Sequence, residues 1–154
     1  MKICIFTHSF PRFHGDTATP FIGNLATALG ELGHKVFILT PYDPLMKTNK
    51  RGPFKIIQYK YISPKNLHVL GYSRTFKEGK SMNLLTYLIS PFMYFFGLLA
   101  LIRLIRKEKL DLVHFPYFSV PILYNRPFVV TIHDLILHHF PTGEASTLLL
   151  PFYQ

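Results

Sequence analysis

Residues 2–41, KICIFTHSFPRFHGDTATPFIGNLATALGELGHKVFILTP, decide the fold. Within them, the short apolar stretch 2–7 is typical of a buried parallel strand, and 35–40 is a second stretch of the same kind. Apolar residues recur at helical spacing over 20–32, and Gly33 ends this pattern as a helix C-cap. Strand, helix and strand in this order form a βαβ unit, whose crossover we expect to be right-handed.

The rest of the chain predicts one long helix and more strands in the same sheet. Further strands are expected at 54–62, 111–115 and 127–132. The first of these is expected nearer the sheet edge. Residues 81–109 carry a long helical pattern in which Pro91 could mark a break. We therefore expect the whole chain, residues 1–154, to form one α/β domain with a Rossmann-like open parallel sheet.

The composition indicates a globular protein that prefers anionic partners. The chain has 49% hydrophobic and 16% charged residues, and 17 Lys and Arg against 8 Asp and Glu give a formal net charge of +9. Such a charge favours acidic lipid head groups, phosphorylated ligands or nucleic acid. No nucleic-acid recognition motif is present, so that partner is not expected. Cys4 is the single cysteine, which suits a reducing compartment, and the N-terminus lacks a signal-peptide pattern.

An apolar run raises the question of a membrane. Residues 84–102 contain no charged side chain, and basic residues flank both ends of this run. The run is about as long as a membrane span. A span would place strand 111–115 across the bilayer from strand 2–7, and the parallel sheet could not form. We therefore expect this helix to pack on the sheet. A purely structural core helix and a helix at the membrane interface both remain open.

Histidines stand where predicted strands run out. His8 follows the first strand, while His114 and His133 lie at the ends of the two last strands. The carboxyl ends of parallel strands share one edge, where open α/β sheets bind ligands. An imidazole there can hydrogen-bond a ligand or move a proton. The alternative is structural: buried core histidines, and Asp134 as a helix cap beside His133. Three histidines at one edge favour a functional site.

The loop at 8–19 resembles a phosphate-binding loop in its position. It follows the first strand and leads into a helix N-terminus, whose dipole and N–H groups attract anions. Gly15 would allow close approach of a ligand, and Thr19 is expected to cap the helix. No G-x-G-x-x-G pattern is present, so an ordinary βα loop is the alternative. A zinc site is not expected, because His138 and His139 lack ligand spacing.

The ordered set of these segments resembles family-4 glycosyltransferases of the GT-B fold. The helix carries the family's LA-x-x-L-x-x-x-G-H-x-V pattern as Leu25-Ala26, Leu29, Gly33-His34 and Val36. The resemblance continues through YKYISPKNLHVLGY, RKEKLDLVHFPYF and RPFVVTIHDL, over nearly the whole chain. It implies that the first domain binds acceptor and a second binds a nucleotide-sugar. Transfer would occur between them with retention at the anomeric carbon.

The resemblance also implies roles for particular residues. His133 and Asp134 are the expected catalytic residues, although many relatives have a small residue in place of Asp134. Donor- or acceptor-binding roles are expected for Gly15 and Asp16 in the first loop, and for His8 and His114 from their places at the strand ends. The family's glycine-rich first loop corresponds to His14-Gly15-Asp16, where one glycine replaces the usual pair. No metal or other cofactor is expected, since the nucleotide-sugar is a substrate.

The donor-binding residues of the family's second domain are not found in these 154 residues. Residues 143–154 begin a helical pattern without a cap. We therefore expect the acceptor-binding half of an enzyme, incomplete at its C-terminal end and inactive alone. The expected partners are a nucleotide-sugar and a glycan or lipid-linked acceptor, with an anionic membrane surface left open as a further partner. The protein is expected in the cytoplasm, and its association with the inner face of the membrane is left open. Two alternatives are a non-catalytic binding or scaffold subunit of the same fold, and a protein anchored by 84–102.

Overall fold

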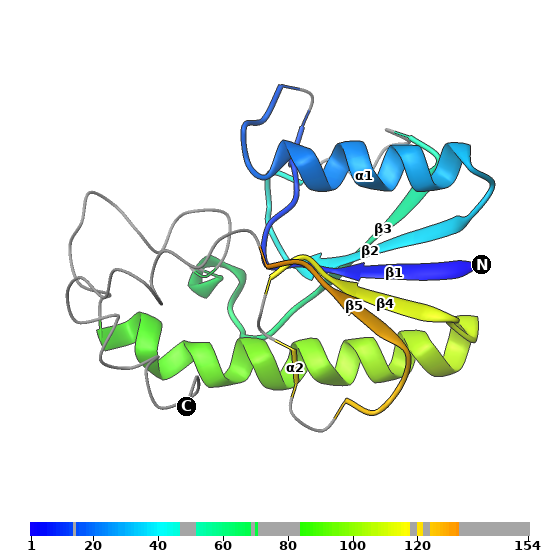
Figure 1. Ribbon diagram of the computed structural model, residues 1–154. Helices are drawn as coiled ribbons and strands as arrows, with labels where there is room; N and C mark the ends of the chain where they lie inside the picture. Colours follow the sequence, from blue (N-terminus) through cyan, green and yellow to red (C-terminus); the bar gives the residue numbers. More distant parts are fainter. Residues whose placement is uncertain are drawn as a thin grey trace, which may run out of the picture.

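The fold is a three-layer α/β/α sandwich around one parallel sheet (Figure 1). The computed structural model describes residues 1–13, 15–46, 52–68, 70, 84–117, 120–121 and 124–132. Its strands are β1 (Lys2–Phe6), β2 (Lys35–Pro41), β3 (Phe54–Tyr59), β4 (Leu112–Phe115) and β5 (Phe128–Val130). Its helices are α1 (Pro20–Glu31), the short 3₁₀ helix η1 (Lys65–Leu67) and α2 (Leu84–Glu108). The predicted open parallel sheet is confirmed.

The strand order reverses beside β1, so the topological switch point of the sheet lies between β1 and β4. The order across the sheet is β3-β2-β1-β4-β5, and every neighbouring pair is parallel. The chain therefore builds outward from β1 to β3, then crosses back through α2 to β4 on the other side of β1. Ligands bind open α/β sheets at the carboxyl ends of strands flanking such a point. Residues after β1 and after β4 are thus the first to consider.

Each face of the sheet buries one core cluster, because successive side chains of a strand point to opposite faces. On one face Cys4, Phe37 and Val113 pack with Leu101 of α2. On the other face Ile5 of β1 and Ile38 of β2 pack with Ile22 and Ala26 of α1. In Figure 1, α1 covers one side of the sheet and α2 the other. Strands buried on both faces explain why their sequences are almost continuously apolar.

Three local predictions are wrong. Helix α2 runs through Pro91 without a break, because Ile89 and Met93 on either side of it are held in the same core cluster. Thr19 does not cap α1 with its side chain: it has a left-handed backbone, with φ of 48°, and its hydroxyl donates to the Ser9 carbonyl instead. The predicted third strand ends at Tyr59 rather than at residue 62. The helical pattern predicted at 143–154 lies outside the described residues.

Helix α2 is long and apolar enough, over Thr86–Glu108, to cross a membrane by length and composition alone. Core helices of soluble proteins pass the same test. Only 33% of the most apolar window is buried inside the structure, but the buried side chains of α2 do pack against the sheet. The prediction that this helix packs on the sheet is confirmed.

Candidate functional site

His8 lies at the switch point, two residues after the end of β1, between two tyrosines. Its ring stacks on Tyr117, which follows β4, at 6.2 Å between centroids and 7° between planes. The edge of Tyr94, from α2, meets the same imidazole at 5.5 Å and 83°. Burial lowers the pKa of His8 and raises the pKa of both phenols. At neutral pH the group therefore offers a neutral imidazole and two protonated hydroxyls, which can all donate and accept hydrogen bonds.

His114 lies one strand away and is tied to the strand beyond it. It pairs in register with Ile5 of β1 and with Val129 of β5, and only 9% of its surface is exposed. Its Nε2 lies 2.8 Å from the Thr131 hydroxyl. The Thr131 amide also donates to the Phe115 carbonyl at 2.9 Å. These two bonds hold the chain after β5 against the end of β4.

Asp16 is fully engaged inside the loop between β1 and α1. Its carboxylate accepts hydrogen bonds from the Arg12 amide at 2.8 Å, from Arg12 Nε at 2.6 Å and from the Ala18 amide at 3.1 Å. The hydrogen bond from the Arg12 guanidinium, more than any other contact, lowers the pKa of Asp16 to about 2. Asp16 therefore holds this loop together through its hydrogen bonds. Its predicted role in binding a ligand stays a prediction.

Gly15 is required by the backbone rather than by a close neighbour. Its φ is 83°, a left-handed conformation that side-chain-bearing residues rarely adopt, and nothing lies within 4 Å of a Cβ built there. Gly15 and Asp16 line a cavity of about 320 Å³ between the loop, one side of α1 and Phe54 of β3. His8 and His114 do not line this cavity.

The N-terminus of α1 offers fewer donors to an anion than the sequence suggests. Pro20 has no N–H, and the Ile22 amide donates to the Thr19 carbonyl at 3.1 Å. Below it, the Thr7 and Thr19 hydroxyls both donate to the Ser9 carbonyl, at 2.7 and 3.1 Å. The described part of the loop is thus held by its own side chains.

The structure gathers the predicted residues into two groups rather than one. His8 lies at the switch point and His114 on the adjacent strand, whereas Gly15 and Asp16 face the cavity beside α1. His133 and Asp134 lie outside the described residues, which end at Ile132. Where the structure is described, no three His, Cys, Asp or Glu side chains come together in a way that could hold a metal ion.

His8, Tyr94 and Tyr117 form what we call the switch-point group, and its two tyrosines were not predicted from the sequence. Tyr117 follows the strand that carries His114, and the rule that drew attention to strand ends could have included it. Tyr94 lies within the apolar run, where nothing in the sequence distinguishes it from its aromatic neighbours. Only the packing of α2 on the sheet turns this tyrosine toward His8.

Comparison with known proteins adds one finding to this geometry. A family model described as Glycosyltransferase Family 4 matches residues 18–153, which is most of the chain. No curated protein matches the chain. The matched region begins just before α1 and includes every element from α1 to β5.

Proposed function

Because the chain belongs to glycosyltransferase family 4, we propose that it is the acceptor-binding half of a retaining enzyme that transfers a sugar from a nucleotide-sugar. The acceptor in this proposal is a glycan or a lipid-linked glycan. The observation that carries the proposal is the family match over residues 18–153 of a chain with an open parallel sheet. The single buried Cys4 suits the reducing cytoplasm, where we place the protein.

The group around His8 suits a sugar. A sugar ring has apolar C–H faces and a rim of hydroxyls, so it is bound by aromatic rings together with a few convergent polar groups. Tyr94 and Tyr117 supply the rings, and the neutral imidazole of His8 can donate to or accept from a hydroxyl. We assign acceptor binding to these three residues.

His133 and Asp134 keep their predicted catalytic role in this proposal. A hydrogen bond from His133 to the donor sugar would strengthen as charge develops at the anomeric carbon, and such interactions appear in kcat rather than in ground-state affinity. With a donor-binding domain present, His133→Ala should lower kcat about 10- to 1000-fold, in line with the loss of one preorganised donor. His114 would act indirectly, because its bond to Thr131 holds the chain two residues before His133.

Titration of the ¹⁵N-labelled chain by NMR tests the proposal. Mono- and disaccharides serve as acceptor probes, and UDP- and GDP-linked sugars as donor probes. We expect the acceptor probes to shift the amide signals of His8 and Tyr117 and to leave Lys35 and Asp111, at the other end of the strands, unchanged. His8→Ala should abolish these shifts. Acceptor shifts confined to Lys35 and Asp111, or identical in His8→Ala, would contradict the assignment.

Transfer activity separates the enzyme from a non-catalytic binding protein. The 154 residues alone are expected to bind acceptor probes without transferring sugar from UDP- or GDP-linked donors. Addition of a family donor-binding domain should produce glycosylated acceptor, detected by mass spectrometry. Acceptor binding without product in this mixture would favour the scaffold alternative.

A further inference from the structure

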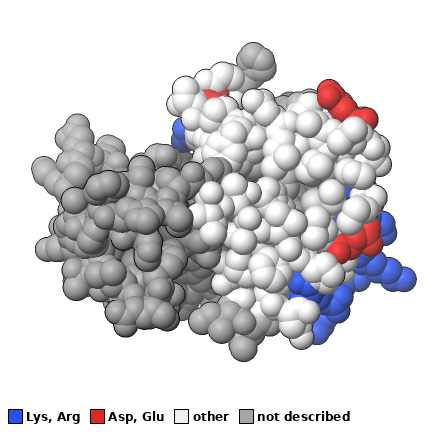
Figure 2. Space-filling model, viewed as in Figure 1, with Lys and Arg blue, Asp and Glu red and all other residues white. Residues whose placement is uncertain are grey.

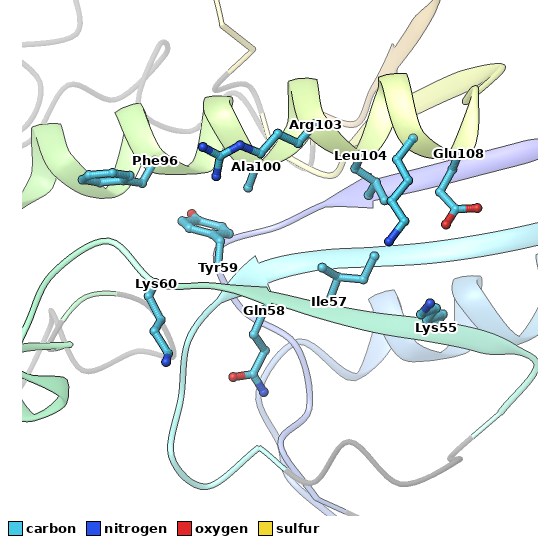
Figure 3. Close-up of a pocket in the computed structure, with 11 residues that line it drawn as sticks. Lys55, Ile57, Gln58, Tyr59, Lys60, Phe96, Ala100, Arg103, Leu104 and Glu108 are labelled. Atoms are coloured by element: carbon cyan, nitrogen blue, oxygen red, sulfur yellow. The ribbon is translucent and has the colours of Figure 1, made fainter.

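A groove of about 580 Å³ runs between the edge strand β3 and helix α2, away from the switch-point group (Figure 3). Its floor is apolar and includes Ile57, Ala100 and Leu104. Figure 3 shows Arg103 lying along α2 above Tyr59, while Lys60 extends from the end of β3 away from the helix. The groove therefore combines an apolar floor with a cationic rim on the side of α2.

Cationic side chains outnumber carboxylates in the lining of this groove. Lys55, Arg103 and Lys107 line it, and the one carboxylate beside them, Glu108, is bonded to Lys35 at 3.0 Å. Within the described part of the chain, neither Arg103 nor Lys107 forms an ion pair. Figure 2 shows Lys and Arg side chains, with a few carboxylates beside them, at the end of the molecule where α2 ends. The groove thus suits an anionic group that arrives from outside.

An exposed apolar stripe of α2 leads up to these cations. Leu88, Phe92 and Phe95 are 60%, 54% and 58% exposed, and their spacing of four and three residues puts them on one face of the helix. The same face continues toward Arg103, whose side chain is exposed. Contiguous exposed aromatic side chains are unusual on a soluble surface and are typical of helices that lie in a membrane interface, with basic residues at the head groups.

Helix α2 cannot serve this role by leaving the sheet. Met93, Leu101 and Leu104 on its opposite face are buried in the larger core cluster. Withdrawing the helix would expose this cluster, at about 1.5–3 kcal/mol for each large side chain. Only the outward stripe and the adjoining groove are available to a bilayer while the fold stays intact.

We propose that the exposed stripe of α2 and the α2–β3 groove together dock the protein on an anionic membrane, with lipid phosphates bound by Arg103, Lys107 and Lys55. The aromatic half of the stripe enters the interface, and the cationic half stays at head-group depth. The occupant is a bilayer surface rather than a second protein, because an apolar stripe that ends in unpaired cations complements a lipid layer and its phosphates together. This inference does not depend on sugar transfer.

Vesicle sedimentation with the complete chain tests the docking surface. The probes are phosphatidylcholine vesicles with and without 30% phosphatidylglycerol, neither of which contains a glycan. We expect binding to the anionic vesicles only. Arg103→Gln with Lys107→Gln should weaken it about 25-fold, because each basic residue near the surface contributes about fivefold. Lys65→Gln removes a charge outside both the groove and the stripe and should change binding by less than about twofold, whereas Arg103→Gln alone should weaken it about fivefold.

The apolar contribution is tested in the same assay. Phe92→Ser with Phe95→Ser should weaken binding about tenfold or more, while Leu45→Ser, an equally exposed apolar residue on the β2–β3 connection, should not. Circular dichroism confirms that each variant is folded.

Several outcomes would overturn the proposal. Equal binding to neutral vesicles, or equal loss in Lys65→Gln and Arg103→Gln, would mean nonspecific adhesion. Release by millimolar inorganic phosphate with no effect of the phenylalanine changes would indicate a soluble phosphate ligand. A change of oligomeric state in Phe92→Ser with Phe95→Ser, without a change in vesicle binding, would indicate a second copy on this face. Extraction by detergent but not by alkaline carbonate would indicate a membrane span.

Discussion

The position of α1 over the sheet depends on a close contact between Gly30 and Pro53, the residue before β3. A Cβ at residue 30 would lie 2.5 Å from Pro53 Cγ and 2.6 Å from the Pro53 carbonyl oxygen. The oxygen belongs to the backbone that enters β3, so it cannot rotate aside as a side-chain tip could. Gly30→Ala must therefore displace either the helix or the strand. Gly23, in the same helix, provides a matched control because the nearest atom to its added Cβ is 3.7 Å away.

The expected free energies follow from two effects. Alanine is favoured over glycine inside a helix by about 0.5–1 kcal/mol, and this gain applies to both positions. Overpacking costs about 1–3 kcal/mol and applies only at residue 30. Gly23→Ala should thus raise the free energy of unfolding by about 0.5–1 kcal/mol. Gly30→Ala should be about 1–3 kcal/mol less stable than Gly23→Ala.

Urea unfolding followed by circular dichroism measures this difference, provided that the m values of the two variants agree. The propensity gain cancels in the comparison, so the difference reports the steric contact alone. A Gly30→Ala protein as stable as Gly23→Ala would refute the reasoning, because it would mean that β3 can move away from α1 at little cost.

Other measurements follow from the ionisable groups. The pKa of Asp16 is lowered to about 2 from an ordinary 3.8, so its carboxylate stabilises the fold above pH 4 and this stabilisation is lost as the pH falls toward 2. After allowance for solvent screening, Asp16→Asn should lower the free energy of unfolding at neutral pH by about 1 kcal/mol, as measured by urea titration. Burial raises the pKa of Cys4 to about 12, so Ellman's reagent should label it only as fast as the protein unfolds, and prompt labelling in native buffer would contradict its burial. Burial also lowers the pKa of His8 and His68, so the unfolded chain binds more protons below about pH 6.5 and the melting temperature should fall with pH there; an unchanged slope in His8→Phe would show that His8 does not contribute.

The sheet could be predicted from the sequence because its strands are buried on both faces. Such strands appear as short apolar runs, and a βαβ unit has one favoured handedness. The edge position of β3 could be predicted as well, because 54–62 mixes polar and apolar residues. The break at Pro91 was predicted from local propensity, and tertiary packing of Ile89 and Met93 overrides it.

The candidate site was only partly predictable, for a different reason. The rule on strand ends locates His8 and His114, but it does not say how side chains from different elements meet. The tyrosine partner of His8 on α2 depends on the rotation of that helix, which the uniformly apolar sequence leaves open. Asp16 could be placed in the right loop but not assigned a contact, since its bonds to Arg12 and Ala18 depend on the loop's backbone path.

Helix α2 connects the switch-point group to the proposed docking surface. Tyr94 contacts His8 although it is itself 51% exposed, and Phe92 and Phe95, two residues before it and one residue after it, lie in the exposed stripe. An α-helix with its side chains is only about 10–12 Å across. A sugar held at His8 would therefore lie within about one helix diameter of the exposed stripe. If the stripe lies on a bilayer, a lipid-linked acceptor could keep its chain in the membrane while its sugar reaches His8. A lipid-linked acceptor and a membrane-docking surface are then consistent with each other, because α2 carries both Tyr94 and the exposed stripe. Each proposal is tested by a separate experiment.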